Sequence, residues 1–238
     1  MNLFLLCLVI ASPVAVTAII FFSVGIAKYN KTAYKRITHT SYLDMIFDKG
    51  KNGEYRIYRS LRKYEEIGFR FLFNLYLPKQ DGQLTELDIV MIGSKGVFVF
   101  QSKNYKGWIF GNDGQKYWTQ VLYNGSGRSR KEHFYNPVWQ NRNHCKVLKD
   151  LLPEKTPIHS IVLFSPRCEL KSLTVRSKDV IVDKSDRVND IVKAILERSP
   201  EQQIDTALIY EKLYPCSQAT DEMKAAHISN IRQEMLKK

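Results

Sequence analysis

The chain opens with an uninterrupted apolar run. Residues 3–27 contain no charged side chain, whereas Lys28, Lys31, Lys35 and Arg36 follow directly. At about 1.5 Å of rise per residue, a helix of this length exceeds the roughly 30 Å hydrocarbon core of a bilayer. A cleavable signal peptide is the alternative, but it would carry basic residues before a shorter apolar run. We therefore predict a transmembrane anchor over residues 1–27.

The charge pattern around this run predicts its orientation. No Lys or Arg precedes the run, and the first basic residues come after it. By the positive-inside rule, the C-terminal side then lies in the cytoplasm. We predict a single-pass protein of the inner (cytoplasmic) membrane with its C-terminal domain in the cytoplasm. Residues 28–50 are read as a basic juxtamembrane linker, either solvated or touching anionic headgroups.

Periodicity changes at about residue 53. Aromatic and aliphatic residues recur every three positions over residues 53–66, which predicts an amphipathic helix. The apolar run 69–77 predicts a buried strand. Residues 86–92 and 96–103 are β-rich and are joined through two glycines, a pattern typical of a hairpin.

The remaining elements alternate between strand and helix. We expect a strand over 116–123, a Gly/Arg-rich loop over 124–131, a helix over 136–152 with Pro137 in its first turn, strands over 158–165 and 179–182, and helices over 187–198 and much of 201–238. This order predicts an α/β fold, with a mixed sheet flanked by helices. Residues 166–238 are expected to form a C-terminal strand and helical extension.

Composition narrows the class of protein. The 238 residues are 44% hydrophobic and 25% charged, which excludes a disordered or fibrous chain. The four cysteines lie far apart, with no CxxC pair, so a disulfide framework or a zinc ribbon is not expected. The formal net charge of +12 favours a polyanionic partner.

Polar residues on the expected hairpin could carry chemistry. Gln101 and Lys103 are two positions apart, so strand alternation directs both to one face, and the hairpin brings that face beside Asp88. Glu86 shares the side of Asp88, and Glu54 lies one turn into the preceding helix. Such oxygen ligands suit Mg²⁺, and a nearby lysine could orient or deprotonate a water molecule. The alternative is that these side chains are simply solvated.

Several motifs in this region resemble one family. Residues 85–111, preceded by Gly53-Glu54, are similar to the nuclease-related domain (NERD) family. Residues 117–120 and 136–152 resemble the family's W-x-Q strand and its N-P-x-x-Q helix. The resemblance covers residues 51–165, which we predict to be a NERD-like nuclease core.

The resemblance implies a fold and a set of roles. The family is grouped with PD-(D/E)xK nucleases, which have a restriction-endonuclease-like fold. Asp88 would then be the metal-binding aspartate, Lys103 the catalytic lysine, and Glu54 the acidic residue of the first helix. Gln140 would lie at the edge of the active site, where the alternative is an exposed helix amide. Gln101 stands where most members carry glutamate, so one metal-binding negative charge is missing.

Basic residues surround the proposed site. Between residues 101 and 150 there are nine Lys/Arg and three Asp/Glu. Basic grooves of this kind bind phosphate backbones. Part of the excess could instead lie against the inner leaflet. We predict contacts to nucleic acid, most simply DNA, from Lys106, Arg128, Arg130 and Lys131.

These observations lead to one functional hypothesis with two rivals. The hypothesis is a membrane-anchored nuclease that hydrolyses DNA phosphodiesters with Mg²⁺, or alternatively Mn²⁺. Its predicted catalytic residues are Glu54, Asp88, Gln101, Lys103 and Gln140, of which Glu54, Asp88 and Gln101 would hold the metal. The rivals are a catalytically inactive, membrane-tethered nucleic-acid-binding module and a protein scaffold that uses the C-terminal helices.

Overall fold

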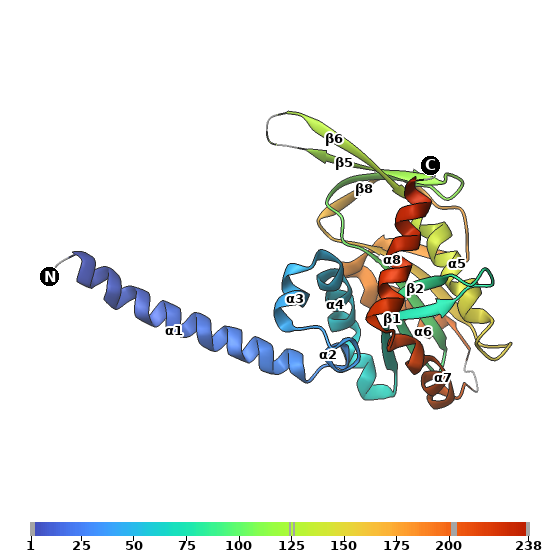
Figure 1. Cartoon of the computed structure of the whole chain (residues 1–238), viewed down its shortest axis with the longest axis horizontal. Helices are drawn as coiled ribbons and strands as arrows, with labels where there is room; N and C mark the ends of the chain where they lie inside the picture. Colours follow the sequence, from blue (N-terminus) through green and yellow to red (C-terminus); the bar gives the residue numbers. More distant parts are fainter. Residues whose placement is uncertain (1–2, 124, 126, 201–203, 237–238) are drawn as a thin grey trace.

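The computed structural model describes residues 3–123, 125, 127–200 and 204–236. Helix α1 (Leu3–Asn30) projects away from a domain built of two sheets with helices around them (Figure 1). Its segment Pro13–Asn30 is long and apolar enough to cross a membrane and is almost entirely exposed. The predicted apolar helix is therefore present as a separate element.

The larger sheet carries the predicted hairpin. Its five strands have the order β1-β2-β3-β7-β9, antiparallel from β1 to β3 and parallel from β3 to β9. Their bounds are Arg70–Pro78 (β1), Leu84–Gly93 (β2), Gly96–Lys103 (β3), Ile158–Phe164 (β7) and Val180–Lys184 (β9). Long apolar runs formed these strands because the sheet is covered on both faces. The mixed α/β fold class is thus confirmed.

A second sheet lies beside the first. Its order is β6-β5-β4-β8, with bounds Ser129–Tyr135 (β6), Tyr117–Tyr123 (β5), Gly107–Asn112 (β4) and Cys168–Thr174 (β8). The β5–β6 hairpin projects from the domain (Figure 1). The sequence predicted a loop over 124–131, and this was wrong in part, because Arg130 and Lys131 pair with β5 as strand residues.

The helices follow the predicted positions closely. α4 (Lys49–Leu61) begins four residues earlier than expected, where Asp48 caps it by accepting a hydrogen bond from the Lys51 N–H. It continues into η1 (Arg62–Ile67), which ends at Gly68. α5 (Pro137–Lys149) begins after Asn136, as predicted. The C-terminal helical elements are η2 (Ser185–Arg187), α6 (Val188–Arg198), α7 (Thr206–Leu213), η3 (Tyr214–Ser217) and α8 (Asp221–Leu236).

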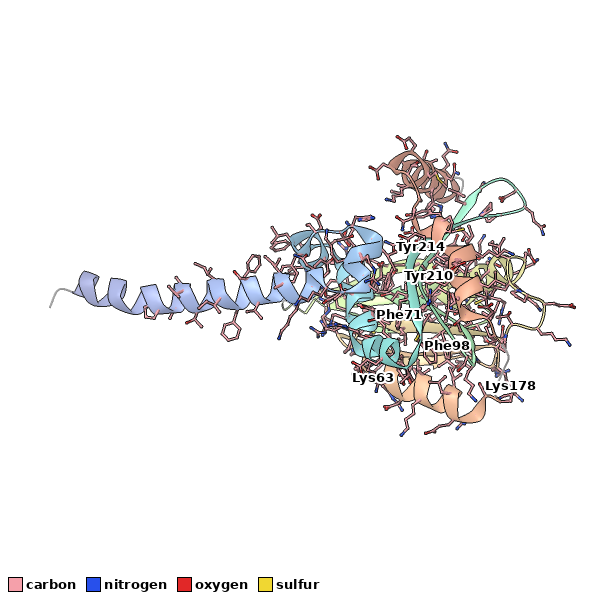
Figure 2. All side chains as sticks on the ribbon, turned by 90° about the horizontal axis from the view of Figure 1, so that it is seen from below. Lys63, Phe71, Phe98, Lys178, Tyr210 and Tyr214 are labelled. Carbon is pink, nitrogen blue, oxygen red and sulfur yellow. The ribbon has the colours of Figure 1, made fainter. Side chains whose placement is uncertain are left out.

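Residues 28–50 are folded rather than a solvated linker. They include α2 (Ala33–Thr38) and α3 (Tyr42–Phe47). Tyr29 and Tyr34 are only 1% and 0% exposed, and the Tyr34 ring lies 4.8 Å from that of Phe73 on β1. The aromatic residues of this segment therefore complete the core of the domain. Figure 2 shows two other core aromatics, Phe71 and Phe98, inside the domain.

Candidate active site

The site begins where β2 and β3 separate. Backbone pairing of the two strands ends at Ile89 and Phe100. The next residue of β2, Asp88, accepts a hydrogen bond from the Ser102 N–H at 2.7 Å through its side chain. On the other side, pairing with β1 passes over Asp88 and Asn74, and Asn74 has a left-handed φ of 51°. Asparagine tolerates this conformation better than most residues. The backbone thus turns the Asp88 carboxylate toward the end of β3.

Gln101 lies opposite Asp88 and binds it directly. The Gln101 Nε2 donates a hydrogen bond to Asp88 Oδ2 at 2.6 Å. This orientation leaves Gln101 Oε1 buried and without a hydrogen-bond partner among the described residues. Buried amide oxygens are normally satisfied, so this oxygen is one that a bound cation or water would satisfy.

Lys103 is held by Gln140 from the neighbouring helix. The Lys103 Nζ donates to Gln140 Oε1 at 2.9 Å. Gln140 is in the first turn of α5, which the Asn136 side chain caps by accepting from the Val138 N–H. Asn141 then fixes α5 on the sheet by donating to the backbone oxygens of β3 and β7. The predicted role of Gln140 at the site edge therefore has a geometric basis.

Glu54 reaches the same region from α4. Gly53 allows this approach, because a Cβ there would lie 3.0 Å from Ser102 Oγ and from Asn104 Cβ. The Tyr34 hydroxyl donates to Glu54 Oε2 at 3.2 Å. The carboxylate is thus positioned by a residue of α2, in the segment that the sequence analysis treated as linker.

One further residue of the site, His227, was missed by sequence reasoning. Glu86 is the next carboxylate on the Asp88 side of β2, and His227 Nε2 lies 3.8 Å from its Oε2. The His227 Nδ1 also contacts the Leu84 carbonyl at 3.0 Å, which ties α8 to β2. A histidine in a C-terminal helix gives no sequence signal of this contact, because the two segments are far apart in the chain.

The charges of the site perturb one another. Burial raises the pKa of Glu54 well above its usual range, and the carboxylates of Asp88 and Glu86 add to this. Burial also raises the pKa of Asp88, against the opposing effect of Lys103. The pKa of Lys103 is lowered by burial. Opposed shifts of acids and a lysine in one place are typical of functional sites.

His144 lies beneath this cluster and belongs to the interior. It is 4% exposed, and burial, with the charge of Lys103, lowers its pKa to about 3. Its Nδ1 has no hydrogen-bond partner among the described residues. The buried imidazole is therefore uncharged near neutral pH and packs as part of the interior.

The predicted metal ligands are two carboxylates and an amide. Within the described part of the chain, no three His, Cys, Asp or Glu side chains come together as a metal centre of those residues alone would require. Glu54, Asp88 and the orphaned Gln101 Oε1 instead provide three oxygen ligands of the kind Mg²⁺ accepts beside its waters. The residues present fit such an ion.

The predicted nucleic-acid contacts are exposed but dispersed. Lys106 lies in the connection between β3 and β4, whereas Arg128, Arg130 and Lys131 belong to the projecting hairpin. Arg130 forms an ion pair with Glu132. Arg167 was not among the predicted contacts, but its Nη2 donates to Asn104 Oδ1 at 2.8 Å, and Asn104 directly follows Lys103.

The arrangement contains the kinds of groups that metal-assisted hydrolysis uses. Partly buried carboxylates lie beside a lysine whose nitrogen is held by an amide. A lysine with a lowered pKa can orient an attacking water or accept a proton from it. Carboxylates and amide oxygens can hold a hard cation against a phosphate.

The sequence is similar to those of known proteins. The family model for the nuclease-related domain (NERD) matches residues 49–165. An uncharacterized protein of Bacillus anthracis is 30% identical over 191 residues, which cover 79% of this chain and 86% of that protein. No solved structure matches the chain significantly.

Proposed function

The chain belongs to the nuclease-related domain (NERD) family, and from this membership we propose that it is a membrane-anchored nuclease that hydrolyses DNA phosphodiesters with Mg²⁺. The observation that carries the proposal is the pairing of Lys103 with Gln140 beside Asp88. A lysine held in place next to a carboxylate serves both water activation and stabilisation of negative charge on phosphate.

Each residue has a distinct part in this proposal. Glu54, Asp88 and Gln101 Oε1 would hold Mg²⁺, which when bound stabilises negative charge on the reacting phosphate. Gln140 keeps Lys103 Nζ in position. Lys103, with its lowered pKa, orients the attacking water and takes up its proton.

The basic residues and α1 determine where this chemistry takes place. Lys106, Arg128, Arg130 and Lys131 would contact the DNA backbone without reading its sequence. In this proposal α1 spans the cytoplasmic membrane and the domain lies in the cytoplasm, as the basic residues after the apolar run favour. Carbonate extraction of membranes would test the anchor, since a spanning protein stays in the pellet.

Cleavage of DNA by the full chain tests the activity. We would incubate the detergent-solubilised protein with linear and circular DNA, in Mg²⁺, Mn²⁺ or EDTA. Asp88→Ala and Lys103→Ala should each lower cleavage by about a hundredfold or more. The control Lys178→Ala changes an exposed lysine away from the site and should cleave like the wild type.

A second function is favoured by one specific contact. Gln101 neutralises a position that carries a charge in most NERD proteins, and it occupies the Asp88 carboxylate with its own amide. This suits a tethered module that binds DNA without cutting it. Metal-independent, salt-sensitive binding, unchanged by Lys103→Ala and without cleavage, would support this function and contradict the nuclease.

A further inference from the structure

A basic cleft lies where α1 joins the domain. It has a volume of about 470 Å³ and is bounded by α1, α3 and α4. Its cations are Lys28, Arg56, Arg59 and Arg62, and no Asp or Glu occurs among its described lining residues. This is a separate site from the carboxylate cluster around Asp88.

Most of these cations lack a partner. Arg62 Nε lies 3.8 Å from Glu65 Oε2. Lys28, Arg56 and Arg59 form no ion pair within the ranges that the structure describes. Like charges around one cleft repel each other, and the attraction of a bound anion to these cations would offset that repulsion. The cleft is therefore built for a negatively charged group.

Its position relative to α1 is fixed by close packing. A Cβ at Gly25 would lie 2.5 Å from the Tyr42 hydroxyl oxygen, so glycine permits α3 to approach α1. The rings of Phe22 and Tyr42 lie 5.5 Å apart. Lys28 is the first charge after the apolar run. The cleft thus lies at the level where a spanning α1 would leave the bilayer.

Apolar side chains continue this surface along α3. Leu43, Ile46 and Phe47 are exposed, and Phe47 is 79% exposed. Exposed aliphatic and aromatic groups beside lysine and arginine are typical of surfaces that lie in the headgroup region of a membrane. A DNA backbone would not bury these apolar groups, whereas lipid acyl chains would cover them.

We propose that this cleft binds the phosphate headgroup of an anionic phospholipid of the inner leaflet, such as phosphatidylglycerol. Lys28, Arg56 and Arg59 bind the phosphate oxygens, for which guanidinium and ammonium groups are suited. The acyl chains lie along α1 and the apolar side chains of α3. The inference rests on the membrane anchor of the proposed function and is independent of nuclease activity.

Titration of the full chain in nonionic detergent tests the cleft. The probes are dihexanoyl phosphatidylglycerol, dihexanoyl phosphatidylcholine, inorganic phosphate and a short DNA duplex, with binding followed by calorimetry. We expect phosphatidylglycerol to bind most tightly, and Lys28→Glu/Arg59→Glu to weaken it about tenfold or more. Arg56 is left unchanged because it also lines a crevice beside Lys103.

The matched control carries the same charge change elsewhere. Lys178 and Arg198 are exposed, and Lys178 lies at the end of the domain away from α1 (Figure 2). Lys178→Glu/Arg198→Glu should bind phosphatidylglycerol like the wild type. Lys28→Arg/Arg59→Lys should retain binding, which separates lost charge from lost folding.

Several results would overturn the proposal. The proposal is contradicted if phosphatidylcholine or free phosphate binds as tightly as phosphatidylglycerol. It is also contradicted if the Lys28/Arg59 substitutions weaken the binding of DNA but not the binding of lipid. Because the short-chain lipids are soluble, these results do not require insertion or cleavage. If carbonate extraction leaves the protein in the membrane pellet but phosphatidylglycerol is not preferred, the lipid site is contradicted and the membrane anchor is supported.

Discussion

Gln101 holds the Asp88 carboxylate by a hydrogen bond, and in the proposed nuclease it would lower the affinity of the site for Mg²⁺. Its amide donates to the Asp88 carboxylate, where a glutamate would place a second negative charge. Gln101→Glu should therefore lower the Mg²⁺ concentration for half-maximal cleavage about tenfold, since ligand charge governs cation affinity. It should also lower the melting temperature without metal, because a hydrogen bond becomes a repulsion.

Metal titrations of cleavage and thermal unfolding in EDTA measure both effects. Gln115→Glu makes the same change on an exposed residue and provides the control. If the two variants respond to Mg²⁺ alike, Gln101 is not a metal ligand.

His144 makes stability depend on pH. Its folded pKa is about 3, against an ordinary value near 6.5, so between these values the unfolded chain binds more protons. The free energy of unfolding then falls as pH falls, by about 1.4 kcal/mol per unit well below 6.5. The raised pKa values of Asp88 and Glu54 act in the opposite direction, because protonation there favours the folded state.

The contribution of His144 is isolated by comparing slopes. Urea unfolding of the wild type and of His144→Gln between pH 7 and pH 5 should show a stability loss on acidification that is smaller in the variant by about 2 kcal/mol in total. His133→Gln, at an exposed position on β6, should keep the wild-type slope. Parallel wild-type and His144→Gln slopes would mean that His144 is not held neutral.

At the scale of elements, the β5–β6 hairpin offers cations away from the carboxylates. Arg128 and Lys131 are exposed, whereas Arg130 is paired with Glu132. If the hairpin binds the DNA backbone, Arg128→Ala and Lys131→Ala should each reduce the slope of log K against log salt by about 0.9. Arg130→Ala should change it less, because its charge is already partly neutralised.

Fluorescence anisotropy with labelled duplex DNA at several salt concentrations measures these slopes. Lys178→Ala is the control for a lost surface charge. Unchanged slopes in the Arg128 and Lys131 variants would remove the hairpin from the DNA interface.

The sequence predicted the elements whose patterns are local. The strands β1, β2, β3 and β7 are buried on both faces, so their apolar runs stand out. β4 and β8 were missed because each buries only one residue: β4 is otherwise half-exposed, and β8 is mostly exposed, as at Lys171 and Ser172. A strand in a small second sheet buries too few side chains to give a recognisable apolar pattern in the sequence.

The same distinction holds for the candidate site. Strand alternation and a hairpin sufficed to bring Asp88, Gln101 and Lys103 together, and the Asn136 cap placed Gln140. Tyr34 and His227 were not predicted, although both contact carboxylates of the cluster. α2 has only six residues and α8 has no pronounced apolar face, so no local pattern indicates which surface either helix packs against.

At the scale of the whole molecule, the N-terminal segment belongs to the domain. Tyr29 and Tyr34 are buried, and Tyr34 also binds Glu54. A fragment that begins at residue 37 should therefore be less stable than one that begins at residue 28, by about 5 kcal/mol or more, since deleting one large buried aromatic group costs about 3–5 kcal/mol.

Urea unfolding of the two soluble fragments measures this difference. Tyr34→Phe in the longer fragment separates the hydrogen bond from the packing and should cost about 1 kcal/mol. Equal unfolding midpoints for the fragments would show that residues 28–36 add nothing to the fold.

The continuity of α1 with the domain also limits where the active site can go. The helix runs unbroken from Leu3 to Asn30, and Tyr29 in its last turn is embedded in the domain core. With α1 in a bilayer, the domain is attached to the membrane by a rigid helix rather than by a flexible linker. The domain can diffuse laterally and rotate about the membrane normal, but α1 fixes its distance from the bilayer surface. DNA in the bulk solution has to approach the bilayer to reach the active site, so cleavage would be confined to DNA at the membrane surface.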